Sequence, residues 1–298
     1  MKTYNDIYLT IRNSLLQAGI EAGSLEARLI LADAAGKEPS ALMRDLKLYT
    51  TQEVEDKAMA ACARRLDGEP VAYITGSWEF YGLPMKVTRD VLIPRMDTEV
   101  MIDAVKELLI GRQMDARILD LCCGSGCIAC AIAKELPASK ITAVDISALA
   151  LDVARENVAA HRLESRVICR QADATAAPPY GIGWFDMIVS NPPYIKTGEL
   201  AKLDASVRNY EPMWALDGGK DGLKFYKAII RNWRTVLRPG GRILFEVGEE
   251  QADDVSMMLE SAGFNNVMTR KDTLGVERVV IAQLSETVLD LGGAETAL

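Results

Sequence analysis

The most chemically specific residues in this sequence are Ser190-Asn191-Pro192-Pro193-Tyr194, which follow the apolar run from Trp184 to Val189. The run predicts a buried strand, and the two prolines end it because neither has an N–H to donate to a sheet. The Asn191 amide oxygen and the Pro192 carbonyl are then two hydrogen-bond acceptors at the strand end. Together they can hold a planar –NH2 group by both hydrogens, with the Tyr194 ring beside it.

Accepting both hydrogens serves a chemical purpose. The lone pair of a planar amine is delocalised, so the nitrogen is a poor nucleophile. Acceptors that pull on its hydrogens favour electron density on nitrogen and set its direction of approach. Orientation of this kind is worth up to about 7–11 kcal/mol when it is ideal. Asn-Pro-Pro-Tyr is equally compatible with a plain strand-ending turn, so its interpretation depends on the rest of the chain.

A second candidate site is the loop Asp120-Leu121-Cys122-Cys123-Gly124-Ser125-Gly126, which lies between a predicted strand and a predicted helix. Gly124 and Gly126 allow the backbone to come close to a ligand. Asp145 ends the next strand, where its carboxylate can accept hydrogen bonds from two ribose hydroxyls. The third glycine of a dinucleotide-binding loop and the Lys-Ser/Thr pair of a P-loop are both missing.

A glycine loop without a phosphate signature, next to an acidic ribose contact, suits S-adenosylmethionine, which has no phosphate. Its methyl sulfonium would point toward Asn191, since ligands of such sheets bind at the carboxyl ends of the strands. Asp173, soon after the third strand, is either an acceptor for the adenine amine or a solvated loop residue.

These residues need a scaffold, and the alternation of apolar segments from residue 117 onward predicts one. Strands at 118–121, 141–145, 167–169, 185–189 and 242–246 alternate with helices, which indicates an α/β fold with a doubly wound, mostly parallel sheet. The strands at 267–270 and 277–282 are too close for a helix between them, so the last strand should run antiparallel. Asp97 or Thr98 is the expected cap of the helix before the first strand.

The domain organisation follows from the same patterns. Residues 1–67 have helical periodicity and predict a small helical bundle. Residues 68–96 predict a linker with a short extended run and then a β-hairpin with its turn near Gly82-Leu83-Pro84. Residues 97–284 form the expected catalytic domain, and residues 285–298 a tail that adds little core.

Composition narrows the classes of function. The 298 residues carry a net charge of -8, which is unusual for a general binder of nucleic-acid backbones. A single histidine leaves little scope for His-based metal sites or Ser/His/Asp catalysis. Without a signal peptide or a membrane span, we expect a cytoplasmic protein with reduced thiols. Cys127-x-x-Cys130 has a ligand-like spacing, but its apolar helical context predicts buried thiols and no metal.

Over nearly its full length the chain resembles the PrmC/HemK family of protein glutamine methyltransferases that act on class 1 peptide chain release factors. Asn-Pro-Pro-Tyr alone is also shared with adenine-N6 DNA methyltransferases, whereas the whole combination is highly specific. The matching segments are Gly68-Glu69-Pro70-Val71-Ala72-Tyr73-Ile74, Glu79-Phe80-Tyr81-Gly82-Leu83, Leu92-Ile93-Pro94-Arg95 with Thr98-Glu99, Asp120 to Gly126, Val144-Asp145-Ile146-Ser147, Asn191-Pro192-Pro193-Tyr194-Ile195, Glu211-Pro212 with Ala215-Leu216, Gly218-Gly219, Asp221-Gly222-Leu223, Glu246-Val247-Gly248 with Gln251, and Gly275 with Arg278.

The resemblance implies a seven-stranded class I methyltransferase (Rossmann-like) sheet and methyl transfer to the side-chain nitrogen of the glutamine in the partner's Gly-Gly-Gln loop. Asn191, Pro192 and Tyr194 would be catalytic and, with Pro193, would bind the substrate. By its position alone, the helical N-terminus (residues 1–67) is the candidate domain for recognising the release factor, and we expect a monomer. The cofactor, leaving as S-adenosylhomocysteine, would contact Cys122, Cys123, Gly124, Ser125, Gly126, Asp145, Asp173, Ala174 and Asn191.

The chain departs from the family pattern at three places. Cys122 replaces the usual first glycine of the loop, so the backbone there must accept a side chain. Ala174 stands where the family often has an aromatic residue, so adenine must find its stacking partner elsewhere. Met96-Asp97 replaces the usual Pro-Glu pair, which is a mild change.

Three other functions compete with this interpretation. An adenine-N6 nucleic-acid methyltransferase would present the same planar amine, but it normally needs a basic groove and a base-flipping domain. A glutamine methyltransferase acting on a ribosomal protein is barely distinguished by these motifs. If the protein were a regulator that binds the cofactor without catalysing a reaction, Asn191 would have no evident function.

Overall fold

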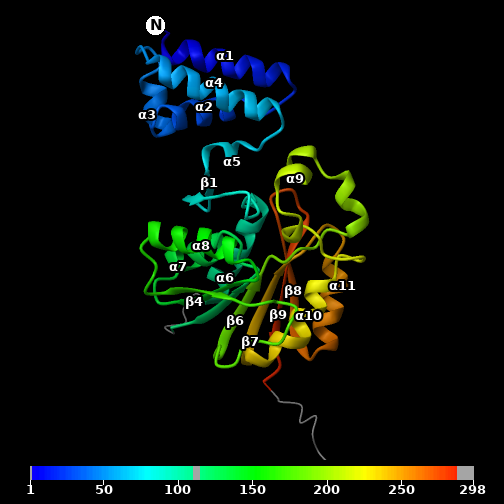
Figure 1. Cartoon of the computed structure of the whole chain (residues 1–298). Helices are drawn as coiled ribbons and strands as arrows, with labels where there is room; N and C mark the ends of the chain where they lie inside the picture. Colours follow the sequence, from blue (N-terminus) through cyan, green and yellow to red (C-terminus); the bar gives the residue numbers. More distant parts are fainter. Residues whose placement is uncertain (1, 110–114, 287–298) are drawn as a thin grey trace, which may run out of the picture. The chain divides into compact units, whose positions relative to one another are not determined.

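The computed structural model describes residues 2–109 and 115–286, and the chain divides into two compact units (Figure 1). The first unit comprises Met1–Trp78, Val87–Arg89 and Lys202–Glu211, and the second comprises Glu79–Lys86, Asp90–Ala201 and Pro212–Leu298. Of the predicted tail at 285–298, only Ser285 and Glu286 are described. The remaining twelve positions lie outside the described residues.

The first unit is helical, as its periodicity predicts. Thr3 and Thr51 cap the two longest helices, and Thr3 forms a reciprocal capping box with Asp6. Apolar faces meet around Ile11 and Ile30, which are fully buried. The helices are α1 (Tyr4–Gln17), α2 (Gly23–Ala34), α3 (Pro39–Arg44), α4 (Gln52–Leu66), α5 (Val71–Thr75) and α9 (Ala205–Tyr210).

The expected extended run in the linker is wrong, because Val71–Thr75 forms α5. Pro70 lies at the helix N-terminus, where its missing N–H is not needed, and Gly76 ends the helix in the left-handed conformation with φ 69°. Glu69 is buried there and accepts hydrogen bonds from Arg64 (2.7 Å) and Arg89 (2.6 Å). The Arg64 hydrogen bond is the main cause of the lowered pKa of Glu69. In this structure the Gly-Glu-Pro motif therefore anchors a helix.

The predicted hairpin is present as β1 (Ser77–Phe80) and β2 (Leu83–Lys86). Its turn is Tyr81-Gly82, one residue earlier than expected, and both residues have positive φ (50° and 70°). Hairpin turns of this kind match the twist of the two strands, and Pro84 is tolerated within the second one because it lies in a two-stranded ribbon.

The second unit is built on a seven-stranded sheet with the order β5-β4-β3-β6-β7-β9-β8, which confirms the predicted fold class. Adjacent strands from β5 to β7 pair in parallel, and β9 is antiparallel to both of its neighbours. The strands are β3 (Arg117–Leu121), β4 (Lys140–Asp145), β5 (Val167–Gln171), β6 (Phe185–Ser190), β7 (Leu237–Glu246), β8 (Phe264–Lys271) and β9 (Glu277–Leu284).

Helices cover both faces of this sheet (Figure 1). One apolar core joins the sheet to α6 (Glu99–Leu109), α7 (Cys127–Glu135) and α8 (Ala148–Ala160). The other joins it to α10 (Lys224–Trp233) and α11 (Ala252–Ser261). The chain also has short 3₁₀ segments, which are η1 (Met96–Thr98), η2 (Thr197–Lys202), η3 (Met213–Ala215) and η4 (Arg234–Val236). Of these, only Lys202 at the end of η2 belongs to the first unit.

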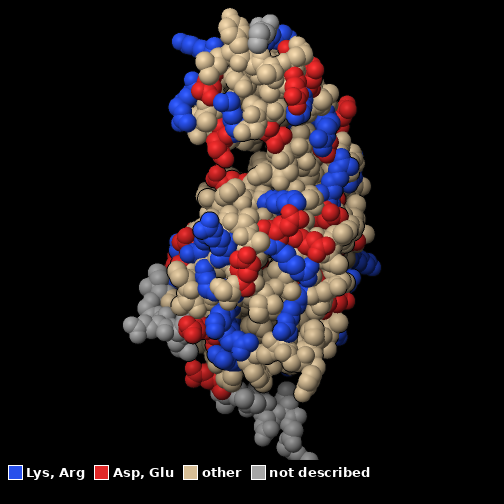
Figure 2. All heavy atoms as spheres, turned by 60° about the vertical axis from the view of Figure 1, so that its left-hand side comes forward, with Lys and Arg blue, Asp and Glu red and all other residues tan. Residues whose placement is uncertain are grey.

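Acidic and basic side chains are interspersed over the face seen in Figure 2. No helix within the described residues has the length and apolar character needed to cross a membrane.

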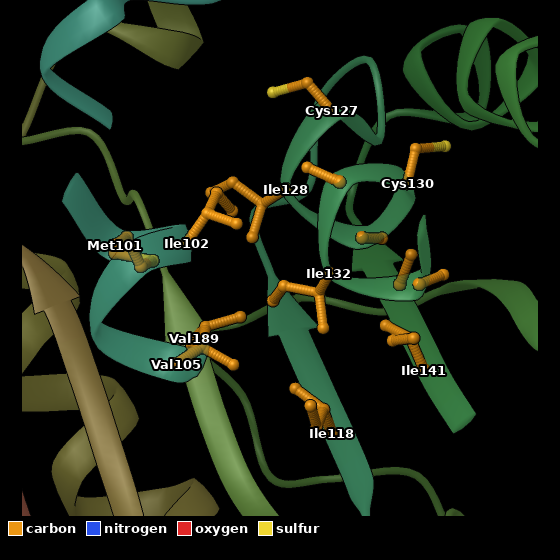
Figure 3. Close-up of a cluster of buried hydrophobic side chains, with 14 of the residues drawn as sticks. Met101, Ile102, Val105, Ile118, Cys127, Ile128, Cys130, Ile132, Ile141 and Val189 are labelled. Carbon is orange, nitrogen blue, oxygen red and sulfur yellow. The ribbon is translucent and has the colours of Figure 1, made fainter. Parts of the chain in front are cut away.

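The two cysteines with ligand-like spacing lie on α7, and Figure 3 shows their sulfur atoms pointing in different directions. Both belong to the core under the helix, together with Ile128 and Ile132. Burial is the main cause of the raised pKa values of both thiols, which therefore stay protonated. Within residues 2–109 and 115–286, no three His, Cys, Asp or Glu side chains are grouped so that they could hold a metal ion.

Candidate active site

A cavity of about 300 Å³ opens at the carboxyl ends of the central strands. Strand order reverses between β3 and β6, and this switch point is where sheets of this class bind ligands. The cavity brings both predicted sites together, since its lining includes the glycine loop, Asp145 and Asn191. Among the residues predicted for the cofactor, only Gly126 is not part of the lining.

The glycine loop is shaped by backbone conformations that side chains rarely adopt. Cys122 has φ 61°, so the chain keeps the left-handed turn at the position where the family has glycine. A non-glycine residue held there costs on the order of 1–3 kcal/mol. Gly124 and Gly126 also have positive φ, and a side chain on Gly126 would come within 3.1 Å of the Ala154 methyl group. Gly126 therefore has a packing role between loop and α8.

Asp145 is held in place by its two neighbouring loops. Its Oδ2 accepts a hydrogen bond from the Gly124 N–H, and its Oδ1 accepts one from the Ser147 N–H, both at 2.9 Å. Burial raises the pKa of Asp145, although these N–H groups oppose the shift. Each carboxylate oxygen keeps a further lone pair, so Asp145 can still accept from ribose hydroxyls.

Asp173 and Ala174 lie in the cavity wall, but Asp173 is partly engaged. Its Oδ1 accepts hydrogen bonds from the N–H and the hydroxyl of Thr175, both at 2.7 Å, which leaves Oδ2 for a ligand. Trp233 donates its ring N–H to the Ala174 carbonyl at 3.0 Å and fixes this segment.

Aromatic groups reach the cavity from elements that sequence reasoning did not connect with it. Trp214 of η3 is 55% exposed and lines the cavity together with Phe225 of α10. Ile146, which follows Asp145, adds a third apolar surface. No local signal could have found Trp214 and Phe225, because each lies far along the chain from the glycine loop.

Asp120, the first residue of the loop, lies in an unusual environment for a carboxyl group. The side chain is fully buried, and neither carboxylate oxygen has a side-chain hydrogen-bond partner in the described chain. Burial raises the pKa of Asp120 to about 8, against the opposing effect of the Ala129 backbone in α7. The buried carboxyl is therefore mostly protonated near neutral pH and adds little negative charge to the site.

Asn191 lines the cavity directly after β6, as predicted. Its Nδ2 donates a hydrogen bond to the Thr98 hydroxyl at 3.2 Å, and its Oδ1 has no hydrogen-bond donor in the described part of the chain. Thr98 does not cap α6 as expected, because η1 runs directly into that helix. The hydroxyl is therefore available to Asn191.

The remaining residues of the motif differ in position. Pro193 lines the cavity, whereas Pro192 and Tyr194 are not among its lining residues. The Tyr194 hydroxyl donates to Oε1 of Glu246 at 3.3 Å, and burial raises the pKa of the phenol. Tyr194 thus supports the motif from inside the protein.

Close backbone packing holds the motif against the loops that follow it. A Cβ atom on Gly218 would lie 2.6 Å from the Tyr194 Cα, and one on Gly222 would lie 2.5 Å from the Tyr194 carbonyl oxygen. The Gln251 amide donates to that same carbonyl at 3.0 Å. The family motifs that contain Gly218, Gly222 and Gln251 therefore all pack against the segment that follows Asn191.

The cavity has the properties that S-adenosylmethionine requires. Asp145 and Asp173 in the lining favour the positively charged sulfonium and ammonium groups, and Arg95 and Lys224 line other parts of the same cavity. The loop before α7 has no side-chain cation for a phosphate, and Trp214 and Phe225 offer apolar surface for a base. These residues would hold the nucleoside and the methionine part of that cofactor.

The sheet and this cavity define a methyltransferase, and comparisons with known proteins agree. Residues 96–208 match the methyltransferase small domain, and residues 7–76 match the PrmC N-terminal domain. The catalytic domain of human Mettl16, solved with an RNA hairpin, shares the fold with a TM-score of 0.56 at 18% identity, covering 79% of this chain and 82% of that one.

Two curated relatives, both named release factor glutamine methyltransferase, match nearly end to end. The protein from Geobacter sulfurreducens is 39% identical over 90% of this chain and 92% of its own length. The one from Cereibacter sphaeroides is 41% identical over 91% of this chain and 94% of its own. The chain belongs to the release factor glutamine methyltransferase family, and the protein is an enzyme.

Proposed function

We propose that this enzyme transfers a methyl group from S-adenosylmethionine to the side-chain nitrogen of the glutamine in the Gly-Gly-Gln loop of a class 1 release factor, in the cytoplasm. The observation that carries the proposal is the Asn191 carboxamide in the cavity wall. Its nitrogen is held by Thr98, and its oxygen is left for a ligand. The relatives' names support the protein substrate.

When bound, S-adenosylmethionine supplies a methyl group attached to a positively charged sulfur. Asp145 would hold its ribose, and the loop from Cys122 to Gly126 would lie against its methionine part. Asp173 would accept from the adenine amine, with Trp214 and Phe225 beside the base.

The chain's own residues prepare the glutamine amide. The Asn191 Oδ1 and the Pro192 carbonyl would accept its two N–H groups, which orients the nitrogen and favours electron density on it. No group in the described chain donates a hydrogen bond to the Pro192 carbonyl. One N–H proton must leave the nitrogen as its new bond forms, and these two oxygens are the acceptors toward which the protons point.

We also propose that the helical first unit recognises the release factor, a role supported by its match to the PrmC N-terminal domain. In this proposal residues 68–96 are the linker and hairpin, and residues 97–284 are the catalytic domain. We further propose that the enzyme acts as a monomer. Recognition is thus separated from methyl transfer, which needs only residues of the second unit.

Asn191→Ala tests the proposal. We expect methyl transfer to recombinant release factor, followed by mass spectrometry, to fall about 10²–10³-fold, as when one oriented polar group is lost from an active site. Binding of S-adenosylhomocysteine, measured by calorimetry, should change little. Asn265→Ala, at an exposed position of β8, is the matched control and should behave as the unaltered enzyme.

Two results would contradict the proposal. If the unaltered enzyme methylated DNA, RNA or a ribosomal protein and left the release factor unmodified, the acceptor would be wrong. If Asn191→Ala mainly abolished cofactor binding, the role of Asn191 would be wrong.

A further inference from the structure

We propose that Thr98 is a positioning residue whose hydroxyl fixes the Asn191 carboxamide with its nitrogen turned toward η1 and its oxygen available to the substrate. The inference rests on the proposed function, because it concerns how the glutamine amide is oriented. It adds a requirement that the Asn-Pro-Pro-Tyr motif does not contain, since the group that orients Asn191 lies 93 residues earlier in the chain.

The need for such a group follows from the shape of a carboxamide. Its oxygen and its –NH2 group have almost the same size, so packing alone does not distinguish the two orientations that differ by a half-turn. One orientation offers an acceptor to a planar amine, and the other offers a donor that would oppose it. A hydrogen bond from Nδ2 to a neighbouring oxygen selects the first orientation, and the Thr98 Oγ1 at 3.2 Å is that oxygen.

In the proposed arrangement the Thr98 hydroxyl donates its own proton to Glu246 and accepts a hydrogen bond from Asn191. The Thr98 side chain is buried, and hydrogen bonding to its hydroxyl is the strongest of the contacts that stabilise the charged form of Glu246. A hydroxyl has one proton and two lone pairs, so a proton directed to Glu246 leaves a lone pair for Asn191. A flipped carboxamide would place its oxygen against this lone pair.

Glu246 is itself enclosed at the end of β7. Tyr194 donates to Oε1, and Oε2 has no hydrogen-bond partner in the described chain. The charged groups that act on Glu246 are Arg278 of β9 and Asp97 of η1, and the Cys127 thiol of α7 feels its charge. Glu246 thus interacts with groups from η1, from the segment after β6 and from β9.

This arrangement makes the orientation of Asn191 dependent on the charge of Glu246. Burial raises the pKa of Glu246 to about 7, with Arg278, Thr98 and Tyr194 opposing the shift. When Glu246 is protonated, its proton can be donated to Thr98, and the Thr98 proton becomes free to point at Asn191. The carboxamide can then adopt either orientation. Turnover at saturating substrate should therefore fall as the pH drops through about 7.

The experiment compares Thr98→Val, which keeps the size of the side chain but lacks the hydroxyl, with Thr98→Ser, which retains it. Thr235→Val is the matched control, because the Thr235 hydroxyl is exposed and bonds only to the carbonyl of Asn232. We expect Thr98→Val to lower kcat about 10–100-fold, the usual consequence of losing one buried hydrogen bond. The KM for S-adenosylmethionine should stay within about twofold, Thr98→Ser should restore turnover, and the fall of kcat below pH 7 should disappear in Thr98→Val.

A second measurement does not depend on catalysis. In protein labelled with [¹⁵N]asparagine, the side-chain protons of Asn191 should be protected from exchange in the unaltered enzyme and in Thr98→Ser, and unprotected in Thr98→Val. Asn191→Asp identifies the signal. If the unaltered enzyme transferred no methyl group, the proposed function would fail, and this signal would still decide whether Thr98 holds Asn191.

Three results would overturn the inference. The first is a Thr98→Val enzyme with unchanged kcat and unchanged protection of the Asn191 amide. The second is a Thr98→Ser enzyme as slow as Thr98→Val, since the methyl group and not the hydroxyl would then matter. The third is a pH profile that is the same in the unaltered enzyme and in Thr98→Val.

Discussion

Gly218→Ala should inactivate the enzyme through a single methyl group placed outside the cavity. The added Cβ would lie 2.6 Å from the Tyr194 Cα and 2.8 Å from the Pro193 carbonyl oxygen. These are backbone atoms, so no side chain can rotate away. Carbon atoms in ordinary contact are about 3.5–4.0 Å apart, so the two segments must separate by roughly 1 Å.

Two backbone hydrogen bonds would transmit that displacement to the reacting groups. The Gly218 N–H donates to the Ile195 carbonyl at 2.8 Å, and the Ile195 N–H donates to the Leu216 carbonyl at 3.0 Å. Separation stretches both bonds and moves the segment that begins at Asn191. A displacement of about 1 Å in an oriented group can lower a rate about 10²-fold, while overpacking costs about 1–3 kcal/mol of stability.

The assay measures kcat on release factor, the affinity for S-adenosylhomocysteine and the thermal unfolding midpoint. Gly198→Ala is the matched control, because a Cβ there meets no atom within 4 Å and Gly198 has no positive φ. We expect Gly218→Ala to remain folded and to bind the cofactor product, but to turn over about 10²-fold more slowly. Unchanged kcat in Gly218→Ala would refute the claim that this packing positions Asn191.

Two further predictions concern Glu246 and Trp214. The folded-state pKa of Glu246 is raised from 4.5 to about 7, so its ionisation removes up to about 3 kcal/mol of stability as the pH rises across that interval. Glu246→Gln should therefore gain stability relative to the unaltered enzyme between pH 5 and pH 8, measured by thermal unfolding without ligand, and a difference that does not vary with pH would contradict the assignment. S-adenosylhomocysteine should alter the fluorescence of Trp214, so Trp214→Phe should lose most of the change. Trp184→Phe should keep it, because Trp184 is 56% exposed but lies outside the cavity lining, and equal responses would exclude Trp214 from the binding site.

Much of the second unit could be predicted because its signals are local. The alternation of apolar runs with helical periodicity indicates the parallel strands and their helices, and Ser147 caps α8 next to Asp145. Glycines in the loop after β3 and prolines after β6 mark the strand ends where ligands bind. The Val71–Thr75 helix was missed because five residues carry too little periodicity to separate a helix from an extended segment.

The candidate site shows the same division between local and distant signals. Asn191, Asp145 and the glycine loop each have a signature within a few residues, so the sequence alone predicts that they belong to a site, and the structure brings them to one cavity. Thr98 instead has the local appearance of a helix cap, and Glu246 that of an ordinary strand-ending carboxylate. Their partnership with Asn191 arises only in the folded sheet, because β6 and β7 are parallel neighbours that end at the same edge, and η1 enters α6 beside that edge.

The sequence by itself therefore indicated the groups that we propose carry the chemistry, since a proline-terminated strand and a glycine-rich turn are properties of short segments. Only the tertiary structure decided which way the Asn191 carboxamide faces. That orientation depends on hydrogen bonds among residues far apart in the chain, and no short segment contains them.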